Sequence, residues 1–398
     1  MRQILESRQR NTQFPEATTL RAKAKLDEAI ANYRKAVQQA PSDAQSHITL
    51  ANALSARGQY DAAIVQYREA IQLDPQEGEW HNLLGNAFTD EGRMEAAVGA
   101  YREAIRLNPY DGWAHNNLGL ALRHQGLNDA AFQTWLQAVR VSPEHAYARN
   151  NYGTALYHRG DIEGAVAEWQ AALEIDPALS VARHNLATVY YQEGMADRAL
   201  QQYHEALRYN PDDIYAHTNL GIAYQSEGRL DESIACWQRA IKSDTRQAEP
   251  HQLLGAALYV KGLVDNAIAE LRESVRLDPH DPWANFNLGI ILSNESNVDA
   301  ARECWEEAVT ADPEFVSAHF NLANALYKLR RFDSAIRSWQ RTIALDRSHA
   351  WAHFNLGYAL RKRGDLEAGR VEIQEALRIN PALAGRTFPM LDALNDER

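Results

Sequence analysis

Apolar and polar positions follow a helical period inside a longer repeat of 34 residues. Apolar residues at positions 7, 8 and 11 lie on one face of a first helix, as Leu118, Gly119 and Leu122 do. A second apolar stripe covers positions 20, 24 and 27. A glycine near position 15 separates the stripes, and an Asp-Pro or Asn-Pro pair such as Asp74-Pro75 ends the second one. The pattern predicts two amphipathic helices in every repeat.

Prolines mark the repeat because they fall on a single grid. They stand at positions 41, 75, 109, 143, 177, 211, 279, 313 and 381. With this proline as position 32, repeats begin at residues 10, 44, 78, 112, 146, 180, 214, 248, 282, 316 and 350. Thr245 and Arg347 replace the proline at two grid points. Pro250 enters the next helix after the first of these, so we expect a seam in the array at residues 245–250.

Small and bulky residues alternate between the two helices of each repeat. Position 8 is Gly or Ala in every repeat, as in Gly119, and position 20 is small as well. Position 24 is bulky throughout: Tyr33, Tyr67, Tyr101, Trp135, Trp169, Tyr203, Trp237, Leu271, Trp305, Trp339 and Ile373. We expect the large side chain of the second helix to fill the space that the small residue of the first helix leaves.

These features resemble the tetratricopeptide repeat family, and the resemblance covers ten full repeats at residues 44–383. It implies an all-α fold, a right-handed superhelical α-solenoid of stacked helix-turn-helix hairpins whose first helices line a concave groove. One hairpin cannot bury its apolar face alone, so the array depends on stacking between neighbours.

The ends of the array depart from the repeat. Residues 1–43 hold a degenerate first repeat, with Pro15 in its first helix and no turn glycine, so we expect one capping helix from about Glu16 to Gln39. Residues 384–398 are expected to form a short capping segment through Phe388, Met390, Leu391 and Leu394. A thinly covered C-terminal end could instead self-associate.

Composition and charge argue against nucleic-acid binding, membrane insertion and secretion. The 398 residues are 45% hydrophobic and carry a formal net charge of -12, which gives nucleic acid no overall electrostatic footprint. No stretch approaches the roughly 20 apolar residues of a membrane span, and residues 1–14 lack the apolar core of a signal peptide. Cys236 and Cys304 are two repeats apart, which argues against a disulfide. We therefore expect a cytoplasmic protein without membrane insertion.

A row of asparagines occupies position 6 of the first helices, on the side that the family resemblance assigns to the groove. It comprises Asn117, Asn151, Asn185, Asn219, Asn287, Asn321 and Asn355. An amide offers a donor and an acceptor, so such a row can pair with the backbone of an extended peptide. The motifs AHNNLG, AHTNLG and AHFNLG are similar to the repeats of the O-linked N-acetylglucosamine transferase superhelix, without its catalytic domain. The alternative is that these asparagines bridge adjacent hairpins.

Aromatic and basic residues share the predicted groove with the asparagines. The candidates at positions 2, 12 and 13 are Trp113, Tyr147, Tyr215, Trp283, Trp351, Arg123, Lys328, Arg361 and Lys362. Position 5 adds Phe286, Phe320 and Phe354 towards the C-terminal end. That end could anchor an aromatic or acidic peptide, or the rings could simply pack between successive first helices.

No constellation predicts catalysis, a metal or a cofactor. Seven histidines fall at position 4, but neighbouring repeats hold them apart, so we interpret them as packing residues. The sequence has no P-loop, dinucleotide fingerprint, nucleophile elbow or zinc-protease motif. Cys236 and Cys304 lack basic neighbours that would activate them. The chain is therefore not expected to be an enzyme.

We expect a scaffold or assembly adaptor that binds an extended peptide segment of a partner protein in the groove. A second interpretation is a structural subunit that uses the convex face or the ends. A third is the recognition arm of an enzyme that acts in trans. The fold does not choose among the pathways that use such repeats.

Overall fold

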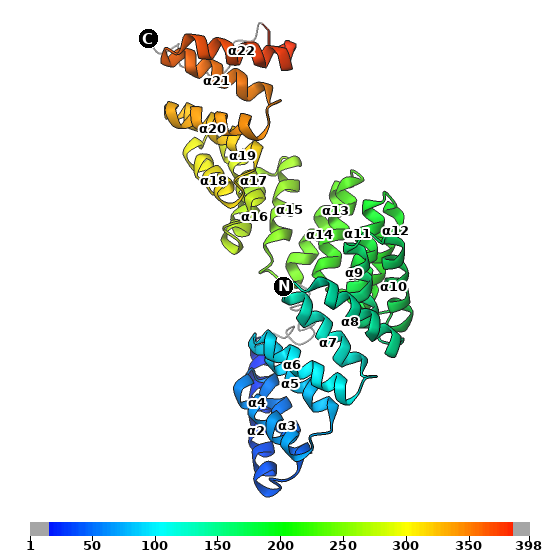
Figure 1. The fold of residues 1–398 in the computed structure, drawn as a ribbon. Helices are drawn as coiled ribbons and strands as arrows, with labels where there is room; N and C mark the ends of the chain where they lie inside the picture. Colours follow the sequence, from blue (N-terminus) through cyan, green and yellow to red (C-terminus); the bar gives the residue numbers. More distant parts are fainter. Residues whose placement is uncertain (1–15, 385–398) are drawn as a thin grey trace. The chain divides into compact units, whose positions relative to one another are not determined.

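The computed structural model describes residues 16–384, and every regular element in this range is helical (Figure 1). The first described element is one long helix, α2 (Glu16–Gln39), as the missing turn glycine predicts. Helical hairpins follow. Their first helices are α3 (Ala44–Ala56), α5 (Gly78–Glu91), α7 (Gly112–His124), α9 (Ala146–His158), α11 (Ser180–Gln192), α13 (Ile214–Ser226), α15 (Ala248–Val260), α17 (Pro282–Asn294), α19 (Val316–Lys328) and α21 (Ala350–Arg363).

The second helix of each hairpin packs against the first. Consecutive hairpins also pack against each other, both within residues 16–209 and within residues 210–384. The second helices are α4 (Tyr60–Leu73), α6 (Met94–Leu107), α8 (Asn128–Val141), α10 (Ile162–Ile175), α12 (Ala196–Tyr209), α14 (Leu230–Ser243), α16 (Val264–Leu277), α18 (Val298–Ala311), α20 (Phe332–Leu345) and α22 (Leu366–Ile379), followed by the short 3-10 turn η2 (Pro381–Leu383). None of the helices within residues 16–384 combines the length and apolarity that crossing a membrane requires. The predicted contacts of Phe388, Met390, Leu391 and Leu394 lie outside the described residues.

The chain divides into two compact units, residues 1–209 and residues 210–398. The seam expected at residues 245–250 falls inside the second unit, where α14 and α15 pack against each other. The linker there keeps the usual conformation because His251 Nε2 donates to the Thr245 carbonyl oxygen at 3.4 Å, the contact that proline carbonyls accept in other linkers. Pro250 is tolerated because it stands in the first turn of α15, where a backbone N–H has no helical partner.

The turn inside each hairpin requires a left-handed backbone at position 15. Glycine occupies this position in most repeats, with φ of 80° at Gly58 and 105° at Gly364. Ser296 and Arg330 take the same conformation, with φ of 64° and 60°. A side chain at such a φ costs roughly 1 kcal/mol, so the fold imposes the turn on both residues against their own preference.

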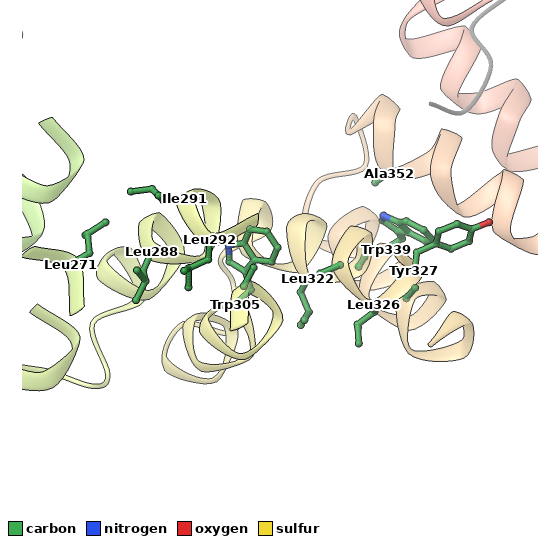
Figure 2. Packing of buried hydrophobic residues seen from close by; sticks show 14 of the residues in the cluster. Leu271, Leu288, Ile291, Leu292, Trp305, Leu322, Leu326, Tyr327, Trp339 and Ala352 are labelled. Atoms are coloured by element: carbon green, nitrogen blue, oxygen red, sulfur yellow. The ribbon is translucent and has the colours of Figure 1, made fainter. Parts of the chain in front are cut away.

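Close helix contact within a hairpin depends on the small residue at position 8, as predicted. A Cβ added to Gly119 would stand 2.4 Å from Trp135 Nε1. Trp135 Nε1 in turn donates to the Asn116 carbonyl oxygen at 3.2 Å. Figure 2 shows the corresponding core of the second unit, where Trp305 and Trp339 pack among leucines of the neighbouring first helices.

Candidate functional site

The first helices carry the residues that the sequence assigned to a binding face. Positions 2, 6, 9 and 13 of a repeat are spaced by four, three and four residues, which places them on one side of a helix. On α17 they are Trp283, Asn287, Ile290 and Asn294. We call this side of the first helices the position-6 face and describe it separately for the two units.

In the first unit, the position-6 asparagines bond to asparagines at positions 5 and 9 of the preceding repeat. Their amides form a continuous series of hydrogen bonds, 2.9 to 3.4 Å long, which we call the amide chain. Its members, from α11 through α9 and α7 to α5, are Asn185, Asn150, Asn151, Asn116, Asn117, Asn82 and Asn86. The amide chain therefore ties four consecutive hairpins together.

The amide chain uses much of the hydrogen-bonding capacity of its members. Asn117 Nδ2 donates to Asn82 Oδ1 and Asn86 Oδ1, both at 3.1 Å. Asn185 Nδ2 donates to Asn150 Oδ1 at 3.0 Å and to Thr154 Oγ1 at 3.3 Å. Both donor hydrogens of each amide are thus engaged within the protein. In this unit the asparagines bridge adjacent hairpins, which is the alternative that the sequence left open.

The sequence did not single out the acceptors of these bonds. They stand at positions 5 and 9 of the preceding repeat, 35 and 31 residues before the donor, as Asn82 and Asn86 do for Asn117. The recurrence of polar residues at these two spacings was the signal that could have identified them.

In the second unit, three position-6 asparagines make no side-chain hydrogen bond to any described residue: Asn219, Asn287 and Asn321. All three are partly exposed. Asn321 lacks a hydrogen bond because Phe286 and Ile290, which stand 35 and 31 positions before it, have no side-chain acceptor. Asn355 differs because Asn324 stands 31 residues before it and accepts from its Nδ2 at 3.0 Å. The second unit therefore leaves amides available on the position-6 face.

The aromatic candidates form small clusters near the start of the first helices. Trp113 contacts His145, with ring centroids 4.1 Å apart, and approaches Tyr147 at 6.0 Å. Trp283 contacts Phe315 at 4.6 Å. Both tryptophans remain more than half exposed, at 56% and 57%. The other candidates at position 2, Tyr147, Tyr215 and Trp351, are partly buried.

The basic candidates separate into packed and exposed side chains. The Arg123 guanidinium lies over the Trp135 ring at 5.5 Å, and burial lowers the pKa of Arg123. Lys362 Nζ lies 5.9 Å from the centre of the Phe332 ring. Lys328 and Arg361 are exposed and have no carboxylate partner among residues 16–384. The structure thus places an unpaired positive charge at the ends of α19 and α21.

The residues at position 4 join each first helix to the linker before it. In six repeats a histidine Nε2 donates to a carbonyl oxygen six residues earlier, at 2.9 to 3.4 Å, from His47, His115, His217, His251, His319 and His353. Arg149, Arg183 and Asn285 make the same contact in other repeats. Position 4 therefore has a packing role. No group of three or more potential metal ligands occurs in the described part of the chain.

The two cysteines are unpaired, and burial is the main cause that raises the pKa of each thiol to about 11. At neutral pH they are therefore protonated and weakly nucleophilic.

Comparison with protein families places repeats along most of the chain. Residues 9–220 match the family described as the cilia and flagella-associated protein 70 C-terminal domain. Residues 190–257, 286–339 and 320–384 match families described as tetratricopeptide repeats. No curated protein matches the chain.

Solved structures with a similar fold include three proteins of low sequence identity. PilF of Pseudomonas aeruginosa is 21% identical, over 55% of this chain and 97% of its own, with a TM-score of 0.47. Yeast Tom70 is 15% identical over 93% of this chain and 96% of its own, with a TM-score of 0.46. YrrB, described as having an unusual peptide-binding site, is 23% identical over 46% of this chain and 95% of its own, with a TM-score of 0.38.

Proposed function

The chain belongs to the tetratricopeptide repeat family, and from this premise we propose that it is a protein-interaction scaffold whose second unit binds an extended segment of a partner protein. The observation that carries the proposal is the set of unpaired amides of Asn219, Asn287 and Asn321. Each offers an acceptor oxygen and two donor hydrogens at the same helix position. An extended peptide presents complementary C=O and N–H groups along its backbone.

The charges at the end of the second unit favour acidic residues in the bound segment. Several arginines of the second unit pair with a carboxylate, as Arg276 does with Glu273 at 2.6 Å. Lys328 and Arg361 do not. A carboxylate of the partner would supply the missing charge, with the strength of a charge-assisted hydrogen bond. We expect binding to weaken as salt concentration rises, because these side chains are exposed.

Hydrogen-bond energies set limits on what the three asparagines contribute to the free energy of peptide binding. A hydrogen bond exchanged for water contributes about 0.5 to 1.5 kcal/mol, so three bonds contribute roughly 1.5 to 4.5 kcal/mol. Loss of all three should weaken peptide binding at least about tenfold.

A selection from a library of short random peptides tests the proposal. Peptides selected on the wild-type protein should be acidic and should lose binding to a variant of the second unit. The test variant is Asn219→Ala, Asn287→Ala and Asn321→Ala, and the matched control is Asn117→Ala, Asn151→Ala and Asn185→Ala.

The control removes the same residue type from the same helix position, where the amides already have partners. We expect it to reduce stability and to retain peptide binding. Equal binding by the wild type and the test variant would reject the asparagine site and move the interaction to the convex face or the ends. Binding lost only in the control would reject the assignment of the site to the second unit.

A further inference from the structure

Two exposed tryptophans occupy equivalent places in the two units. Trp113 follows the first residue of α7, and Trp283 follows the first residue of α17. They are 170 residues apart, which is five repeat lengths (283 − 113 = 170). Their exposed fractions, 56% and 57%, are nearly equal. An exposed indole is costly in water, and here the same exposure occurs twice.

The backbone around each tryptophan is built in the same way. Asp111 caps α7, and its Oδ1 accepts from the backbone N–H of Trp113 at 2.9 Å and of Ala114 at 3.0 Å. Asp281 caps α17 and accepts from Trp283 at 2.8 Å and from Ala284 at 3.2 Å. A carboxylate is therefore fixed beside both indoles.

Each indole packs against a buried, uncharged ring from the next linker. The His145 ring is 4.1 Å from Trp113, and the Phe315 ring is 4.6 Å from Trp283. Burial lowers the pKa of His145 to about 4, so its imidazole is neutral at pH 7. Neither supporting ring carries a positive charge that would repel a cation from the indole.

Further carboxylates recur at the same sequence positions relative to both tryptophans. Glu79 and Glu249 hold position 2 of the preceding first helix, 34 residues before each tryptophan. Glu144 and Glu314 directly precede the supporting rings, and all four glutamates are exposed. The sites differ in their charged surroundings, because Arg341 donates to the Pro313 carbonyl oxygen at 3.2 Å beside Glu314. The first site has Ala171 at the corresponding place and is therefore the more acidic one.

We propose that Trp113 and Trp283 are the centres of two equivalent sites for a positively charged side chain, lysine or arginine, of a partner protein. A cation over the face of an indole is attracted by the ring's quadrupole, and nearby carboxylates add Coulomb attraction. The two sites go beyond the asparagine site, because they use other residues and select the opposite charge. They also give the acidic chain a place for basic partners in both units.

Nuclear magnetic resonance of the indole N–H groups of the full chain tests this inference. The signals of Trp113 and Trp283 among the nine tryptophans are assigned by Trp113→Leu and Trp283→Leu. The probe is a short Gly-Ser peptide with a single arginine, and its two controls carry glutamine or glutamate in place of arginine. We expect saturable shifts of both indoles with the arginine peptide, and binding two- to fivefold weaker with the glutamine peptide.

Variants of the protein test which residues bind the arginine peptide. Glu79→Gln with Glu144→Gln should weaken the arginine peptide at Trp113 and leave the shift at Trp283 unchanged. The variant Asn219→Ala, Asn287→Ala and Asn321→Ala should leave the shift at Trp113 unchanged because all three substitutions lie in the second unit, which separates this inference from the asparagine site. Equal binding of the glutamine peptide, preference for the glutamate peptide, or no shift at either indole with arginine would overturn it.

Discussion

Two asparagines at the same helix position should respond in opposite directions to the same substitution. Asn185 and Asn321 both hold position 6 of a first helix and are both partly exposed. Asn185 Nδ2 donates to Asn150 Oδ1 and to Thr154 Oγ1. Asn321 makes no side-chain hydrogen bond to a described residue. Replacement by alanine therefore removes interactions in one case and none in the other.

The magnitudes follow from those contacts. Asn185→Ala loses two hydrogen bonds of about 1 kcal/mol each and leaves the buried Asn150 Oδ1 without a partner. Alanine recovers about 0.6 kcal/mol because asparagine is a poor helix former. We expect a net loss of about 1.4 kcal/mol or more for Asn185→Ala. Asn321→Ala removes no hydrogen bond and gains only the higher helix propensity of alanine. Helix α19 should therefore be stabilised by about 0.6 kcal/mol.

Hydrogen exchange measured by mass spectrometry is the appropriate assay, because repeat arrays open in parts and one global transition would average them. Peptides from α9 to α11 should exchange faster in Asn185→Ala, and peptides from α17 to α19 should exchange more slowly in Asn321→Ala. Equal destabilisation by both substitutions would refute the reasoning. It would show that Asn321 has a structural partner or that the amide chain contributes nothing.

Four further substitutions test the fold. Ser296→Gly and Arg330→Gly should each stabilise the second unit by about 1 kcal/mol in urea denaturation, because both residues have positive φ. Gly119→Ala should cost about 1 to 3 kcal/mol in the same assay, since its Cβ would displace Trp135. His145 has a folded pKa of about 4, below its unfolded value, so the stability it confers is complete above about pH 6.5 and decreases by up to roughly 3 kcal/mol towards pH 4. His145→Phe should reduce that pH dependence, and an unchanged pH profile would contradict it.

The sequence predicts the repeat and its internal packing because both depend on residues close together in the chain. The first helix, Glu16–Gln39, followed from the missing turn glycine, and the contact between Gly119 and Trp135 followed from the sizes of the two side chains. Ser296 and Arg330 showed that the period persists without glycine, and both adopt the glycine conformation. Local pattern was sufficient for each of these features.

Whether an individual side chain is bonded within the protein or open to a ligand was less predictable, because it depends on pairs of residues in neighbouring repeats. The sequence predicts that Arg123 faces a ligand in the groove. In the structure its guanidinium lies over the Trp135 ring and the side chain is partly buried. Nothing within its own repeat distinguishes Asn185, which is bonded, from Asn321, which is not. For this pair the distinction lies one repeat earlier: Asn150 and Thr154 stand 35 and 31 positions before Asn185, whereas Phe286 and Ile290 stand there before Asn321.

One residue type that recurs at the same position of successive repeats therefore does not define one function. At position 6 the same amide joins hairpins where the preceding repeat supplies an acceptor, as Asn150 does for Asn185. It remains open to a ligand where that repeat supplies Phe286 and Ile290, as it does for Asn321. We therefore expect that removal of the acceptor in the preceding repeat would free the amide without any change to the asparagine itself. Position 6 thus joins hairpins through Asn185 in the first unit, and we propose that it serves recognition through Asn321 in the second.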